Sequence, residues 1–176
     1  MSAGTLSSMS AAPEFEVAAW LNAKGPVSLA ALRGKVVAVY AFQMLCPGCV
    51  SHGIPQAKRL RQAFGRDELE VLGLHTVFEH HAVMTPAALQ AFIHEYRIDF
   101  PVGIDQPSNT GPLPLTMAHY RLRGTPTLLL FDRQGVLREQ LFGIVDDLRL
   151  GALLGRLVTE AAPVDTARCD DGVCHI

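Results

Sequence analysis

Leu45-Cys46-Pro47-Gly48-Cys49 is the stretch of this 176-residue sequence that decides its fold. It follows the apolar run over residues 36–42, which predicts a strand covered on both faces, because such strands are apolar nearly throughout. A strand that ends in Cys-x-x-Cys and continues as a helix places the sulfur of Cys46 at the helix N-terminus. Unpaired N–H groups and the positive end of the helix dipole favour a thiolate there. Pro47 falls at the first helical position, where its missing N–H costs nothing.

The second cysteine of the motif lies one helical turn after the first. Cys49 is on the same face as Cys46, within reach of a disulfide. Gly48 has no side chain, so a partner chain can approach Cys46 closely. The motif predicts a redox dithiol, but half of a zinc site or a pair of small buried apolar residues are the alternatives. The only other cysteines, Cys169 and Cys174, lack the spacing of a zinc ribbon, which favours the redox interpretation.

Composition predicts one domain without a nucleic-acid partner. The hydrophobic content of 49% in 176 residues is enough for one buried core and little for two. The net charge is -2, and acidic and basic residues are scattered along the chain, so there is no basic stripe for DNA or RNA.

The two ends differ from the middle of the chain. Residues 1–13 hold no Lys or Arg and no long apolar stretch, so we expect a flexible N-terminal tail and no signal peptide. No run approaches the length that spans a bilayer, so we expect no membrane association and a cytoplasmic location. Thiols are kept reduced there, which favours a catalytic Cys-x-x-Cys. Residues 14–161 form the predicted domain, and residues 162–176 a C-terminal tail that contains cysteines.

Hydrophobic periodicity and turn residues predict alternating strands and helices along the domain. The helix after Cys46 is interrupted at Ile54-Pro55, because an interior proline removes a hydrogen bond. The predicted elements are an N-terminal β-hairpin over residues 15–29, a helical turn at 30–32, strands at 36–43, 70–75 and 100–104, helices at 46–64, 85–96 and 115–120, a strand pair at 127–131 and 136–142, and a last helix at 146–161. This order predicts an α/β sheet covered on both faces.

Two motifs together resemble the thioredoxin superfamily. The first is the strand that leads into Cys46-Pro47-Gly48-Cys49, and the second is Arg123-Gly124-Thr125-Pro126-Thr127, about eighty residues later. The N-terminal hairpin, the approach over residues 28–37 and the βα unit around residues 69–98 are similar to the TlpA-like and AhpC/TSA-like redoxin branch. The resemblance covers about residues 14–160. It implies a thioredoxin-like α/β fold, with a central mixed β-sheet flanked by helices, an N-terminal β-hairpin and an inserted βα unit.

The resemblance also implies roles for individual residues. Cys46 matches the nucleophilic cysteine, Cys49 the resolving cysteine, and Pro126 the cis-proline beside the dithiol. An ordinary proline at a strand start is the alternative for Pro126. The implied substrate-binding surface surrounds these positions and consists of Leu45, Pro47, Gly48, Thr125 and Pro126. The implied activity is thiol-disulfide exchange with protein or small-molecule disulfides, supported by a reductant such as a thioredoxin or glutathione system. The resemblance implies no cofactor and no metal.

Two departures from the family separate this chain from thioredoxin itself. Leu45 stands where many members have Trp, which makes the rim of the site more apolar. Tyr40 stands where thioredoxins have a buried acid that helps to deprotonate the resolving thiol, so we expect slower release of the mixed disulfide. A peroxiredoxin-like thiol peroxidase is an alternative function. However, residues 42–45 contain neither the hydroxyl nor the proline that those enzymes place before their cysteine.

Two further groups of residues could bind a metal. His75, His80 and His81 with Glu79 could hold an ion, but neighbouring side chains in an extended segment point to opposite faces, which favours a polar loop beside the site. In the tail, Cys169, Cys174 and His175 permit three interpretations: a second redox pair that relays electrons to Cys46–Cys49, a soft-metal clip in a metal-binding or chaperone protein, or a tail without function.

Overall fold

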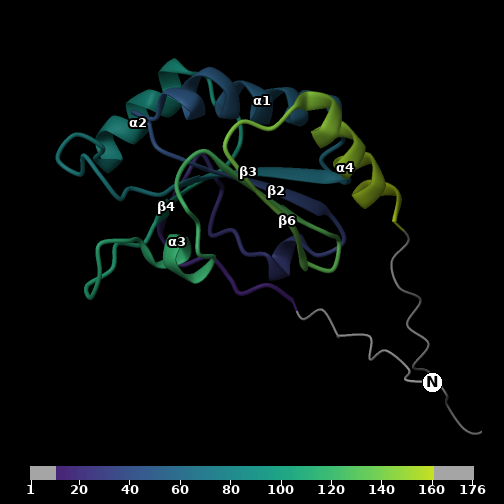
Figure 1. Cartoon of the computed structure of the whole chain (residues 1–176), viewed down its shortest axis with the longest axis horizontal. Helices are drawn as coiled ribbons and strands as arrows, with labels where there is room; N and C mark the ends of the chain where they lie inside the picture. The colour runs from purple at the N-terminus through teal and green to yellow at the C-terminus, as the bar shows by residue number, and fades with distance from the viewer. Residues whose placement is uncertain (1–10, 161–176) are drawn as a thin grey trace, which may run out of the picture.

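Six strands form one mixed β-sheet in the computed structural model, which describes residues 11–160 (Figure 1). The strands are β1 (Val17–Leu21), β2 (Val36–Phe42), β3 (Leu69–His75), β4 (Val102–Asp105), β5 (Thr127–Phe131) and β6 (Leu137–Phe142). Their order across the sheet is β1-β4-β3-β2-β5-β6. Strands β2, β3 and β4 run parallel, whereas β1, β5 and β6 are antiparallel to their neighbours. Every residue of β2 and β5 is buried, as their apolar sequences predict.

Helices cover both faces of this sheet. They are a 3₁₀ turn η1 (Ala30–Leu32), a π-helical turn η2 (Cys49–Gly53), α1 (Ile54–Ala63), α2 (Pro86–Glu95), α3 (Leu115–His119) and α4 (Asp147–Thr159). Figure 1 shows α1, α2 and α4 along one face and α3 on the other. Even-numbered residues of β2 pack with the first group, and odd-numbered ones pack with α3, because strand side chains alternate between faces. None of the helices within residues 11–160 is long and apolar enough to cross a membrane.

The helix after the dithiol is interrupted where the sequence predicts. The π-helical turn η2 ends at Gly53, and α1 begins at Ile54 with Pro55 in its first turn. Pro55 has no N–H to donate, so it is accommodated where a new helical segment starts. The βα unit over residues 69–98 is also confirmed, with β3 followed by α2.

The predicted N-terminal β-hairpin is wrong. Strand β1 pairs with β4, with Val17 opposite Asp105, and residues 22–29 contain no strand. The chain turns away at Asn22, which adopts a positive φ of 54°. The side-chain amide of Asn22 donates to the carbonyl oxygens of Ile98 (2.8 Å) and Phe100 (3.0 Å). These bonds attach the end of β1 to the segment before β4, and not to the residues that follow β1.

Residues at the start of the described chain are bonded to the rest of the domain. The backbone N–H of Ala12 donates to the carbonyl of Gly135 at 3.0 Å, and the hydroxyl of Tyr120 donates to the carbonyl of Pro13. The packed structure therefore already includes residues 12–13, which the sequence assigned to a tail. The predicted C-terminal tail over residues 162–176, with Cys169 and Cys174, lies outside the described residues.

Two glycines test how tightly the sheet is packed. A Cβ atom on Gly73 of β3 would lie 3.1–3.3 Å from side-chain atoms of Phe42, Phe100 and Val102, whereas one on the exposed Gly151 of α4 would contact nothing within 4 Å. We expect Gly73→Ala to lower the free energy of unfolding by about 1–3 kcal/mol, because overpacking forces its neighbours to move. The control Gly151→Ala should raise it by about 0.5–1 kcal/mol, since alanine favours helix. Urea titrations measure both changes, and stabilisation by Gly73→Ala would contradict the packing.

Candidate active site

Cys46 caps the start of a helix at the end of β2. Pro47 is the first helical residue, as the sequence predicts. The backbone N–H of Cys49 donates to Sγ of Cys46 at 3.4 Å, and Sγ of Cys46 lies 3.4 Å from the carbonyl oxygen of Thr125, to which the thiol donates. Cys46 is partly exposed. The residue therefore lies at the surface of the domain, and its sulfur is held by a helix N–H group that stabilises negative charge.

Cys49 lies behind Cys46 and has no solvent-exposed surface. Burial, and after it the hydrogen bond with the Cys46 side chain, raise the pKa of the Cys49 thiol to about 12. Both cysteines are free thiols in this structure. At neutral pH the thiol of Cys49 therefore keeps its proton, which makes the two sulfurs chemically unequal.

Pro126 lies against the start of the same helix. The Thr125–Pro126 peptide bond is cis, as the family resemblance implied. A Cβ atom on Gly48 would lie 3.3 Å from Cδ of Pro126, and one on Gly53 would lie 3.6 Å from its Cβ. The absence of a side chain at Gly48, which was expected to admit a partner chain, thus also lets the ring of Pro126 approach the helix.

Two exposed apolar side chains form a rim next to Cys46 and Pro126. Leu45 is 57% exposed, and Ile144, in the turn after β6, is 61% exposed. The turn is attached to the site because the N–H of Gly143 donates to the carbonyl of Pro126 at 2.8 Å. Sequence analysis found Leu45 but missed Ile144, whose only signal is an isolated apolar residue in a turn between a strand and a helix.

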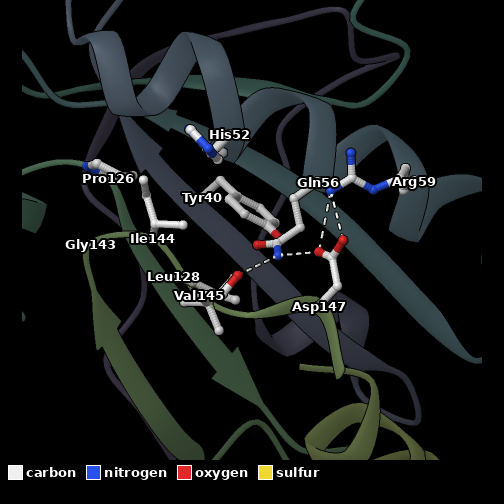
Figure 2. Close-up of a pocket in the computed structure, with 11 residues that line it drawn as sticks. Tyr40, His52, Gln56, Arg59, Pro126, Leu128, Gly143, Ile144, Val145 and Asp147 are labelled. Carbon is white, nitrogen blue, oxygen red and sulfur yellow. Dashed lines mark hydrogen bonds and ion pairs between the residues drawn. The ribbon is translucent and has the colours of Figure 1, made fainter. Parts of the chain in front are cut away.

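A cavity of about 160 Å³ lies beside Pro126, between β2, α1 and the turn before α4 (Figure 2). The hydroxyl of Tyr40 donates to Oε1 of Gln56 at 3.1 Å, and Nε2 of Gln56 donates to Oδ1 of Asp147 at 2.7 Å. Arg59 forms an ion pair with Asp147 at 3.1 Å. Burial raises the pKa of Tyr40, whereas the hydrogen bonds from Gln56 and Arg59 lower the pKa of Asp147. Tyr40, expected to stand in place of a buried acid, is thus linked to a carboxylate supplied by α4.

The histidines near the site lie in different environments. His75 is buried at the end of β3, whereas His80 and His81 are exposed on the loop that follows. Glu79 accepts a hydrogen bond from Nε2 of Gln43 at 3.3 Å. Within residues 11–160, no group of three metal-ligating side chains is arranged to hold an ion. The predicted second redox pair, Cys169 and Cys174, falls outside this range.

Comparisons with known proteins agree with the geometry. The model of the AhpC/TSA family matches residues 9–140. The crystal structure of a thioredoxin-like superfamily protein is 58% identical, covers 87% of this chain and 99% of its own, and superimposes with a TM-score of 0.85. A thiol-disulfide isomerase from Corynebacterium glutamicum is 52% identical, with 85% and 96% covered and a TM-score of 0.82. A thioredoxin-like protein in the oxidized form shares the fold at 22% identity, with 84% and 93% covered and a TM-score of 0.69. No curated protein matches the chain.

The unequal exposure of the two sulfurs predicts selective alkylation. Iodoacetamide should modify Cys46 in the folded, reduced protein at least about tenfold faster than Cys49, because buried thiols are inert. Mass spectrometry of proteolytic peptides measures each site separately from Cys169 and Cys174. Unfolding in guanidinium is the control, and there the two rates should become similar. Equal rates in the folded protein would contradict the burial of Cys49.

The Tyr40–Gln56 hydrogen bond predicts that two Tyr→Phe variants differ in stability. Tyr40→Phe leaves Oε1 of buried Gln56 without its donor, so we expect the free energy of unfolding to fall by about 1–3 kcal/mol. Tyr96 is 42% exposed, and its hydroxyl makes no hydrogen bond to any residue in 11–160. Tyr96→Phe should therefore change the free energy of unfolding by less than about 0.5 kcal/mol. Urea unfolding measures both, and equal effects would show that the buried bond does not stabilise the fold.

Proposed function

This chain belongs to the AhpC/TSA family, and from that premise we propose that it is an enzyme that exchanges its Cys46–Cys49 dithiol with disulfides of proteins or small molecules. The arrangement of the two thiols carries the proposal. Cys46 is partly exposed at a helix N-terminus beside the cis peptide of Pro126, and Cys49 is buried behind it. The relative from C. glutamicum, named a thiol-disulfide isomerase, supports the same class of reaction at 52% identity.

The first step is attack by Cys46. Its thiolate, stabilised by the N–H of Cys49, attacks one sulfur of the substrate disulfide. A bond forms between Sγ of Cys46 and that sulfur, the substrate S–S bond breaks, and the second substrate sulfur leaves as a thiolate that takes a proton from water. Of the two thiols of the motif, Cys46 begins the reaction, because Cys49 has no exposed surface.

The second step releases the product. Cys49 loses its proton to water, and its thiolate attacks Sγ of Cys46. The Cys46–Cys49 disulfide forms, the mixed disulfide bond breaks, and the first substrate sulfur leaves as a thiolate that takes up a proton from water. Two electrons have then passed from the dithiol to the substrate. A thioredoxin or glutathione system returns the enzyme to the dithiol by the same exchange in reverse. Because burial holds the pKa of Cys49 near 12, its deprotonation limits this step at neutral pH.

The surroundings of Cys46 favour a disulfide over a peroxide as substrate. Residues 42–45 before it are Phe, Gln, Met and Leu, with no hydroxyl to hold a peroxide. The exposed side chains of Leu45 and Ile144 instead provide apolar contact for the residues that flank a disulfide.

Assays of the two substrate classes test the proposal. We expect the protein to accelerate reduction of insulin by dithiothreitol, and Cys46→Ser to reduce this rate to that of dithiothreitol alone, because the attacking sulfur is lost. Cys49→Ser should accumulate a covalent adduct with insulin chains on Cys46, which mass spectrometry detects. Rapid consumption of hydrogen peroxide without insulin reduction would instead establish the thiol peroxidase.

The raised pKa of Cys49 predicts a pH dependence of product release. Below its pKa, the thiolate fraction of Cys49 grows about tenfold for each unit of pH, so the rate of mixed-disulfide resolution should rise about tenfold per unit between pH 6 and pH 8. A protein loaded with a chromogenic thiol on Cys46 measures this step in a single turnover. Loading of Cys49→Ser is the control, which should show no release at either pH, and a flat wild-type profile would contradict the mechanism.

A further inference from the structure

A second cavity, of about 490 Å³, lies at the carboxyl ends of β3 and β4. Its walls come from the end of β3 and the loop that follows, between His75 and Pro86, and from the end of β4 and the loop that follows, between Ile104 and Pro114. In Figure 1 these two loops project from the same end of the molecule, on the left, beside α2 and α3. Ligands of α/β proteins commonly bind outside the carboxyl ends of parallel strands. This volume is within the range of small-molecule sites.

The lining is apolar apart from a few convergent polar groups, which is the usual make-up of a small-molecule site. The apolar members are Val77, Phe78, Met84, Pro86, Ile104, Pro107, Pro112 and Pro114. Four of these are prolines, whose ring C–H groups offer compact apolar surfaces against which an aromatic ring can pack. The lining therefore favours a planar apolar ligand.

His75 is the polar group that lacks a partner. It is the last residue of β3, only 1% exposed, and its ring packs on Phe42 with centroids 5.3 Å apart. No described residue forms a hydrogen bond with its Nε2 atom. An unpaired buried polar atom is costly, and a ligand in the cavity that His75 lines can supply the missing bond. Burial lowers the pKa of His75 to about 4, so the imidazole is neutral at neutral pH.

Asp105 is the acidic side chain in the wall of the cavity. It is 3% exposed, and its carboxylate accepts N–H groups of Thr116 (2.8 Å) and Met117 (3.0 Å) at the start of α3. Burial raises the pKa of Asp105, and these hydrogen bonds oppose that rise. An anionic ligand would lose its hydration against the apolar lining and would lie near this acidic side chain, and the neutral His75 offers it no positive charge.

We propose that this cavity binds a small, uncharged aromatic molecule that carries one hydroxyl group. The ring fills the proline-lined space, and the hydroxyl pairs with Nε2 of His75. A hydroxyl can donate or accept, so it satisfies either tautomer of the imidazole. Binding does not depend on the redox function proposed above, because no residue of the dithiol lines the cavity.

The cavity is nevertheless connected to the dithiol through the backbone. Phe78, which lines it, donates its N–H to Oε1 of Gln43 at 3.3 Å, and the carbonyl of Gln43 accepts the N–H of Cys46 at 3.2 Å. A molecule bound in the cavity would therefore contact Phe78, which is bonded to Gln43, and Gln43 in turn holds the turn that contains Cys46.

Titration of the full-length protein with phenol tests the proposal. Backbone amide NMR should show saturable shifts at Phe78 and Ile104, on opposite walls of the cavity. Benzoate has the same ring with a negative charge, and it should bind at least about tenfold more weakly. Absence of saturable shifts with phenol, or equal affinity for benzoate, would overturn the proposal.

Three variants separate the cavity from the rest of the surface. Val77→Phe adds bulk inside the cavity and should abolish phenol binding, whereas Val83→Phe adds the same bulk on the same loop at a 58% exposed position outside the lining and should leave it unchanged. His75→Phe keeps a ring but removes Nε2, so phenol should bind about threefold to tenfold more weakly. Circular dichroism checks folding. If His75→Phe does not fold, the two valine variants decide, and equal phenol affinity in them would reject the site.

Discussion

The antiparallel pairing of β2 with β5 is the constraint on which the rest of the structure depends. Tyr40 lies opposite Leu128 and Ala41 opposite Thr127, so the end of β2 and the beginning of β5 meet at one edge of the sheet. This register brings Sγ of Cys46 to 3.4 Å from the carbonyl of Thr125, 79 residues away. Because both strands are buried on both faces, a shift of one residue would move every side chain of the shifted strand to the opposite face, disrupt the packing of both cores and separate the two halves of the site.

Burial then gives the two sulfurs different chemistry. Cys46 accepts the helix N–H of Cys49 and reaches solvent, whereas Cys49 packs among apolar residues of the core on one face of the sheet. A sulfur that must meet a substrate needs exposure, and one that must react only afterwards is kept protonated by burial. The Tyr40–Gln56–Asp147 network lies in the same half of the molecule and ties β2 to α1 and to the start of α4.

Parallel pairing of β2, β3 and β4 places three carboxyl ends at the same edge of the sheet. The dithiol follows β2, and the larger cavity is built on the ends of β3 and β4. Gln43 is the shared element, since it bonds to the Cys46 turn through its backbone and to the loop after β3 through its side chain. The same strand arrangement thus places the dithiol and an adjoining cavity at one edge of a single sheet.

Local patterns in the sequence determined the central strands, the interrupted helix, the Cys46–Cys49 motif and the position of Pro126, because periodicity and proline chemistry act over a few neighbouring residues. Only the tertiary structure decided that β1 pairs with β4 and not with residues 27–29, since strand pairing depends on which free edge is nearest. It also decided that Ile144 joins the rim, that Asp147 reaches Tyr40 through Gln56, and that His75 is buried without a partner for Nε2. These features arise from contacts between residues distant in the chain, and no local pattern encodes such contacts.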